Sequence, residues 1–256
     1  MTVITGALDF PPVSHLLEWP DFLLKGSLLG INKVVLLTIM GAVLVVVFFW
    51  AAGRRQAVVP SGAQNLGEMA IEFVERDIVV NVMGPEAKHW TPFIASIFFF
   101  ILALNLLGLV PVLQMPVNAR MALPMYLALQ TWLLMILVGF KHQGFKFIPN
   151  TLFPPGVPKA LMPLLAFIEL LSVFILRPFT LMVRLFANLM AGHMLLTTFY
   201  VLSSALFVKS VLVVALPLPV FMAIFVTAFE LLVALLQAYI FSILTAVYIS
   251  ESMHGH

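Results

Sequence analysis

The chain has 256 residues, of which 62% are hydrophobic and 9% are charged, and its formal net charge is +2. A soluble domain carries about 25% charged residues, so this composition excludes a water-facing globular protein. The abundance of apolar residues also excludes a disordered chain. No basic stripe exists to bind nucleic acid, and the absence of cysteine excludes disulfides and thiolate metal sites. The composition predicts a multi-span membrane protein, and the apolar stretches taken in turn below make it an all-α integral membrane protein with about five membrane helices.

The beginning of the chain does not look like a cleavable signal peptide. Asp9, Glu18 and Asp21 interrupt it, and no basic segment precedes an apolar run. Residues 1–33 are predicted to be an N-terminal segment, which the distribution of basic residues given below places outside the membrane. A membrane-crossing helix needs about 20 apolar residues, and three stretches meet this requirement: 34–52, 92–113 and 122–140. Pro111 is expected to break the second of these helices.

An amphipathic helix is predicted between the first two spans. Ser61 and Gln64 form a capping-box pattern. Apolar residues then share one helical face, opposite Glu68, Glu72, Glu75 and Arg76; they are Leu66, Met69, Ala70, Phe73 and Val74. Such a helix would lie on the cytoplasmic surface of the membrane or, given its acidic face, against a partner protein. A simple solvated connector is the alternative.

Two longer apolar stretches, 160–208 and 210–250, follow a proline-rich loop. As a single helix the first would extend about 74 Å, more than twice the roughly 30 Å hydrocarbon core. Each stretch could be a tight pair of spans or one long, strongly tilted helix. A pair needs a polar turn near the middle, and neither stretch has one. Two long tilted helices, separated by Lys209, are therefore predicted, with 34–250 as one membrane domain and 251–256 as a tail.

Basic residues predict the orientation, because cytoplasmic loops collect Lys and Arg. With the N-terminus outside, the cytoplasmic side holds Arg54, Arg55, Arg76, Lys88, Lys141, Lys146 and Lys159. The outer side holds a smaller set: Lys25, Lys33, Arg120 and Lys209. The sequence predicts an external N-terminus and a cytoplasmic C-terminus.

Five ionisable residues interrupt the two long apolar stretches: Glu169, Arg177, Arg184, His193 and Glu230. A charge in the membrane costs about 2.5–3.5 kcal/mol even on an insertion scale, so such groups are paired, face water or carry ions. With Arg184 at 0°, α-helical geometry places Arg177 at about 20°, Asn188 at about 40°, Glu169 at about −60° and His193 at about 180°. Ala187 and Ala191 share the side of Arg184, where another helix could approach closely.

The last stretch carries a polar file. Glu230, Gln237 and Tyr248 lie within about 20° of one line and span about 27 Å, which suits a hydrated proton path. An imidazole titrates near neutral pH, so a contact between His193 and Glu230 could exchange protons. Arg184 cannot relay protons, because its guanidinium stays protonated; its role would be electrostatic. Structural ion pairs that only hold helices together are the alternative reading.

Nucleotide and hydrolytic motifs are absent from the sequence. It has no phosphate-binding Gly-rich loop ending in Lys-Ser/Thr, no His-Glu-x-x-His and no Gly-x-Ser-x-Gly. The chain is expected to bind no cofactor and no metal, and any enzymatic reaction would be carried out by partner proteins.

The run Arg184-Leu-Phe-Ala-Asn-Leu-Met-Ala-Gly-His193, with Glu230 and Leu-Gln-Ala-Tyr-Ile-Phe from Leu236, resembles subunit a of F-type ATP synthases of the bacterial type. The likeness runs from about Trp50 to Ser250. Asn105, in Ala-Leu-Asn-Leu-Leu-Gly-Leu-Val-Pro, fits the pattern of the second span. Two departures stand out: Gly108 replaces an acid of some relatives, and the spacing from Glu169 to Arg184 is one residue longer than in some.

This resemblance implies long tilted helices packed around a rotating ring of c subunits. Arg184 would face the ring carboxylate and separate two offset proton half-channels. His193 and Glu230 would line the outer one, Asn188 and Gln237 would lie beside the arginine, and Tyr248, Thr180 and Glu169 would border the cytoplasmic route. The implied partners are the c-ring, a peripheral-stalk b subunit, the other synthase subunits and membrane lipid. The implied location is the bacterial plasma membrane.

Two other functional readings stay open at the level of sequence. A free-standing secondary transporter predicts inverted repeats and broken helices around a central site, and no such repeat is visible. A purely structural anchor predicts that Arg184 has an ion-pair partner whose joint neutralisation restores function.

Overall fold

The computed structural model describes residues 32–54, 57, 59–110, 118, 120–153, 161–208 and 217–254. Regular structure within these ranges is helical throughout, which confirms the predicted all-α class. The elements in chain order are α2 (Lys33–Gly53), α3 (Ala63–Phe73), η1 (Val74–Val80), α4 (Asn81–Met83), η2 (Pro85–Trp90), α5 (Thr91–Leu109), α6 (Ala122–Gln143), η4 (Gly144–Lys146), α7 (Phe147–Leu152), α8 (Met162–Leu171), η5 (Ser172–Leu176), α9 (Arg177–Val208) and α10 (Pro217–His254).

Five helices in the described ranges are long and apolar enough to cross a membrane: Lys33–Gly53, Pro85–Leu109, Ala122–Leu152, Met162–Ser204 and Pro217–Met253. The chain is therefore a multi-pass membrane protein. Most of the predicted N-terminal segment, the turn at Lys209, the break at Pro111 and the prolines at 154–158 lie outside the described residues. Of the predicted tail, residues 251–254 belong to α10.

Local sequence explains where the shorter helices begin and end. At the start of α2 the side chain of Asn32 accepts a hydrogen bond from the Val35 amide at 3.0 Å. At the end of α5, Val110 is already extended, because a residue before proline is disfavoured in helical conformation. The end of α6 is followed by Gly144 with a φ of 62°, a conformation that favours glycine.

The capping box predicted at Ser61 and Gln64 is wrong. The residue before α3 is Gly62, with a φ of 60° and no side-chain cap, and Gln64 Nε2 instead donates to the Ala57 carbonyl at 3.0 Å. The predicted apolar face is only partly buried: Val74 is 0% exposed, whereas Leu66 is 59% and Met69 58% exposed. α3 packs on α2 through Gly67 against Ala52.

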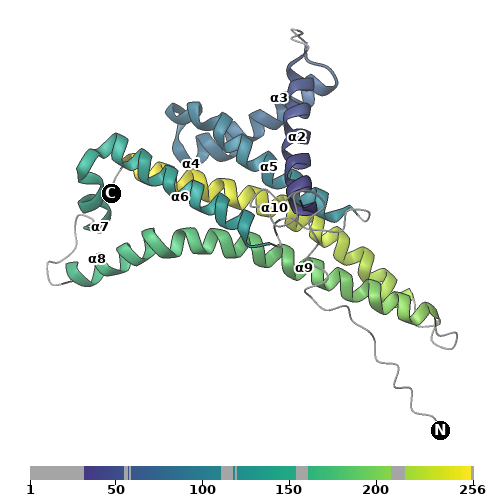
Figure 1. The fold of residues 1–256 in the computed structure, drawn as a ribbon. Helices are drawn as coiled ribbons and strands as arrows, with labels where there is room; N and C mark the ends of the chain where they lie inside the picture. Colours follow the sequence, from purple (N-terminus) through teal and green to yellow (C-terminus); the bar gives the residue numbers. More distant parts are fainter. Residues whose placement is uncertain are drawn as a thin grey trace.

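The two long helices form without a polar turn in their middle, as predicted. α8, η5 and α9 run on as one gently curved rod, and α10 lies beside it (Figure 1). The interruption in the first rod is the π-helical stretch η5. Pro178 follows it and cannot bond the carbonyl of Phe174, with which its ring would also clash. A π-helical turn relieves this conflict, and the Trp132 indole N–H donates to the nearby Val173 carbonyl at 3.0 Å.

α10 is the centre of the packing. It contacts α5, α6 and α9, and the main buried cluster draws residues from these four helices and from η1. α2 packs on α3 and α5 and stands at a large angle to α6, α9 and α10 in Figure 1. The fold therefore places the charged residues of α9 against a well-supported helix.

Candidate functional site

Three polar contacts align α9 with α10. The helices run antiparallel, and Arg177, Asn188 and Gly192 of α9 meet Tyr248, Gln237 and Glu230 of α10 respectively. We call this line of contact the α9–α10 seam. All three members of the polar file predicted on α10 therefore face α9, and the file lies inside a helix–helix contact.

Arg184 lies at the edge of this seam. It is half-buried, while its neighbours Leu181 and Leu185 are 1% and 0% exposed. The small-residue side predicted around it is open, because Ala187, Asn188 and Ala191 are all exposed. Arg184 forms no ion pair with any residue that the structure describes. A cation that pairs with none of the described residues, and that lies next to an open row of small residues, is available to a group on another chain.

Asn188 and Gln237 connect the two helices one turn beyond Arg184. Asn188 Nδ2 donates to Gln237 Oε1 at 2.8 Å. Gln237 is 2% exposed, and its Nε2 has no hydrogen-bond partner within the described ranges. The sequence predicted both residues beside the arginine, and the structure brings them together.

Glu230 packs against the backbone of α9 at Gly192. A Cβ placed on Gly192 would lie 2.5 Å from Glu230 Oε1, so the carboxylate occupies space that only glycine leaves free. Consecutive helical residues point about 100° apart, and His193 is therefore turned away from this contact. In the described part of the chain Glu230 and His193 share no hydrogen bond or ion pair. Their direct contact stays a prediction.

Arg177 is engaged in its own set of contacts. Its Nη1 lies 2.6 Å from Glu251 Oε2, and its Cζ lies 5.0 Å from the centroid of the Tyr248 ring. Thr180, an exposed residue, donates its hydroxyl to the Arg177 carbonyl at 3.1 Å. The site at this end of the seam thus contains an ion pair that helical phase within one helix does not predict.

Glu169 lies in α8, on the far side of η5 from Arg184. A π-helical stretch turns less per residue than an α-helix, so the angle predicted for Glu169 from uninterrupted α-helical geometry does not apply. The same stretch can absorb the one-residue excess between Glu169 and Arg184.

Asn105 joins α5 to α10, the helix that carries the polar file. Asn105 is 1% exposed, and its Nδ2 donates to the Ala234 carbonyl at 3.2 Å. Ala234 lies between Glu230 and Gln237 in the sequence of α10. Asn118 Nδ2 in turn donates to Asn105 Oδ1 at 2.7 Å. The predicted site residue Asn105 thus contacts the helix that carries the polar file.

Sequence reasoning missed Gly192, Asn118 and Glu251. Glu251 was assigned to the tail because it follows the apolar run, although its spacing of three residues from Tyr248 places both on one helical side. Gly192 carries no side chain, so nothing in the sequence indicates that it leaves space for a carboxylate of another helix.

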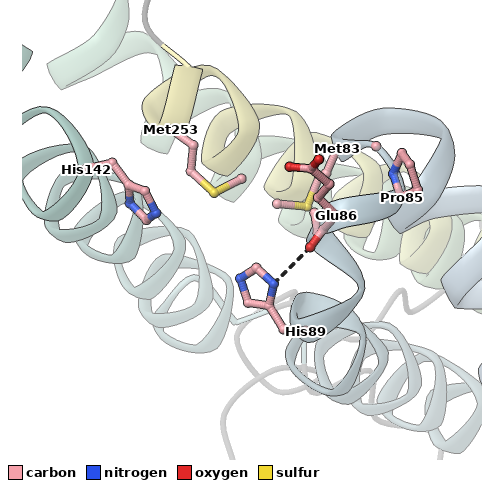
Figure 2. A pocket seen from close by; sticks show the side chains of 8 residues that line it. Met83, Pro85, Glu86, His89, His142 and Met253 are labelled. Atoms are coloured by element: carbon pink, nitrogen blue, oxygen red, sulfur yellow. Dashed lines mark hydrogen bonds between the residues drawn. The ribbon is translucent and has the colours of Figure 1, made fainter.

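A separate pocket of about 440 Å³ lies near the C-terminal end of α10. Its lining residues are Met83, Gly84, Pro85, Glu86, Ala87, His89, His142 and Met253. Figure 2 shows the ring of His89 turned toward the Glu86 carbonyl, to which its Nδ1 donates at 3.3 Å. None of the ten predicted site residues lines this pocket. Among the described residues no group of three His, Cys, Asp or Glu is placed to hold a metal ion.

Comparison with known proteins identifies the family of the chain. The model of the ATP synthase A chain family matches residues 34–250. The chain is 42% identical to the ATP synthase subunit a of Frankia alni, over 93% of this chain and 83% of the relative. It is 41% identical to that of Rhodococcus erythropolis, over 92% and 87%, and 39% identical to that of Gluconacetobacter diazotrophicus, over 89% and 90%. The chain therefore belongs to the ATP synthase A chain family.

Proposed function

We propose that this chain is the proton-conducting stator subunit of an F-type ATP synthase, with Arg184 facing the carboxylates of a rotating c-ring. The observation that carries the proposal is the position of Arg184: a half-buried cation at the edge of the α9–α10 seam, beside the exposed residues Ala187 and Ala191. Small residues let a neighbouring helix approach closely. A carboxylate on such a helix would be held in its ionised form by the guanidinium, which itself keeps its proton.

His193 and Glu230 form the outer half-channel in this proposal. Protons enter from outside through these two residues and load a ring carboxylate. The contact of Glu230 with Gly192 supports this assignment, since Gly192 follows Arg184 by eight residues, about 12 Å along α9, and a membrane carboxylate thus lies inside the seam near the arginine. Asn188 and Gln237 lie between the carboxylate and the arginine and add buried polar atoms to the path.

The cytoplasmic half-channel lies at the opposite end of α9. Thr180, Tyr248 and Glu169 border it, and protons leave along it after nearly a full rotation of the ring. Asn105 supports the seam from α5. The N-terminus is outside and the C-terminus cytoplasmic, in the plasma membrane of a bacterium, because the larger set of basic loop residues then lies inside.

The chain itself catalyses no reaction on ATP in this proposal, and the ATP chemistry belongs to partner subunits. Its partners are the c-ring, the b subunit of the peripheral stalk, other synthase subunits and lipid. Large apolar side chains that are exposed along α8, η5 and α10 support such contacts; they include Leu164, Phe167, Phe174, Phe221, Phe225 and Leu232. Exposed apolar surface on this scale marks membrane or protein contacts.

Passive proton conductance tests the role of Arg184. We expect vesicles that contain the assembled complex with Arg184→Ala to lose ATP-driven proton pumping and to leak protons without ATP turnover, because no cation separates the half-channels. Arg76→Ala is the control, since Arg76 of η1 forms an exposed ion pair with Glu72 of α3, away from the seam. Normal pumping by Arg184→Ala would contradict the proposal. Proton transport by the purified chain alone would support a free-standing transporter instead.

A further inference from the structure

The Arg177 side chain links three helices at one end of the seam. On α10 it pairs with Glu251 at 2.6 Å and lies over the ring of Tyr248, and on α6 its Nη1 is 3.9 Å from Met135 Sδ. The side chain of Arg177 is 19% exposed and that of Glu251 is 40% exposed. The cation is thus largely covered, and its charge is neutralised by a carboxylate from the last turns of α10.

Among the ion pairs between described residues, this one differs in the helices that it joins. The other two join Arg76 to Glu72 and Lys88 to Glu75, both within residues 72–88. The pair of Arg177 with Glu251 is the one that joins α9 to α10. Nearby, Gln143 of α6 donates from Nε2 to the Ser252 carbonyl at 2.9 Å, so α6 holds the same end of α10 in place.

Buried apolar residues pack together in the seam between Arg177 and Asn188. Leu181 and Leu185 of α9 are buried in one cluster with Ala238 and Phe241 of α10. Apolar side chains can repack when one helix moves past another by a turn of about 5.4 Å, so this cluster alone does not define one alignment. Polar pairs can define it, because a shifted alignment leaves them unpaired. Arg184 lies between two such pairs, seven residues after Arg177 and four before Asn188.

We propose that Glu251, acting through Arg177, is a positioning residue that fixes the axial alignment of α9 against α10 and thereby the height of Arg184 in the membrane. This inference rests on the proposed role of Arg184. Reactive groups that are misplaced by about 1 Å can lose roughly a hundredfold in rate, so the alignment of the two helices matters for proton transfer. Glu251 neither receives nor donates the transported proton in this account.

Glu251→Gln in the assembled complex tests the inference, because it removes the charge while keeping the size of the side chain. Proton-driven ATP synthesis per assembled complex should fall about fivefold, the order expected for losing a partly buried ion pair. The matched control is Glu75→Gln, which breaks the 2.8 Å pair with Lys88 away from the seam and should leave the rate unchanged. An unchanged rate in Glu251→Gln would overturn the inference.

A double-mutant cycle tests whether the two residues act as one unit. Arg177→Gln combined with Glu251→Gln should be no slower than Arg177→Gln alone, because the pair is already broken in the single variant. Rate losses that simply multiply would overturn the inference.

A distance measurement reads the alignment directly and does not depend on the role of Arg184. The chain has no cysteine, so nitroxide labels can be attached after Tyr200→Cys on α9 and Ile240→Cys on α10. In Glu251→Gln the distance between the labels should shift or spread by up to about one helical turn, 5.4 Å; a single, unchanged distance would overturn the inference. Normal ATP synthesis by Arg184→Ala would instead overturn the proposed function, whatever the labels show.

Discussion

The carboxylate of Glu230 fills the space beside the α-carbon of Gly192, where a methyl group would lie 2.5 Å from Glu230 Oε1. The two residues belong to different long helices, and neither can change without affecting the other. This contact fixes where a membrane carboxylate meets the helix that carries Arg184.

Gly192→Ala should displace the Glu230 carboxylate and slow proton translocation while the complex still assembles. The side-chain end of Glu230 can move, so we expect a loss of roughly five- to tenfold in ATP-driven proton pumping rather than misfolding. Glu230→Gln should slow pumping as well, since it removes the titratable group.

Gly53→Ala is the control for this variant, because nothing lies within 4 Å of a Cβ at that position. Equal pumping rates in Gly192→Ala and Gly53→Ala would show that the position of the Glu230 carboxylate does not matter for transport.

Gln237→Leu should weaken the connection between α9 and α10 next to Arg184. It removes the 2.8 Å hydrogen bond to Asn188 and replaces a buried polar group with an apolar one of similar size. A lost hydrogen bond contributes about 1 kcal/mol, and proton-driven ATP synthesis per complex should therefore fall about fivefold. Gln130→Leu, at an exposed position of α6, should leave synthesis unchanged; if Gln237→Leu did the same, the hydrogen bond between Gln237 and Asn188 would not matter for proton transport.

Asn105→Leu should reduce stability more than rate. Asn105 is buried and bonds both the Ala234 carbonyl and Asn118, so its loss leaves the buried amide of Asn118 without its acceptor. We expect a cost of about 1–3 kcal/mol, visible as a lower thermal midpoint of the purified complex. The exposed residue Asn81 provides the control, as Asn81→Ala should change stability by less than about 0.5 kcal/mol. Identical midpoints for the two variants would contradict the support role of Asn105.

The sequence was sufficient to predict the helices but not how they align. Long apolar runs with prolines or charges at their ends predicted α2, α5 and α6 to within a few residues. Helical phase also predicted that Glu230, Gln237 and Tyr248 share one side of α10, and all three face α9. Periodicity within one helix cannot say which residue of another helix lies opposite, so the contacts with Gly192 and Arg177 required the structure.

Two errors have local physical causes. The start of α3 was predicted from side-chain capping, but Gly62 turns the chain through its positive φ instead. The angle of Glu169 assumed an unbroken α-helix, whereas Pro178 is accommodated by the π-helical stretch η5. Both errors come from backbone conformations that hydrophobic periodicity does not record.

In the proposed function, Arg184 couples proton movement to the rotation of the ring. The most direct test of this coupling is proton-driven ATP synthesis by vesicles carrying the fully assembled complex with Arg184→Ala, normalised to the amount of complex. We expect synthesis to be abolished and assembly to be retained, because no other described residue places a cation beside the open row of Ala187 and Ala191. Sustained synthesis in that variant would show that Arg184 does not couple proton movement to the ring.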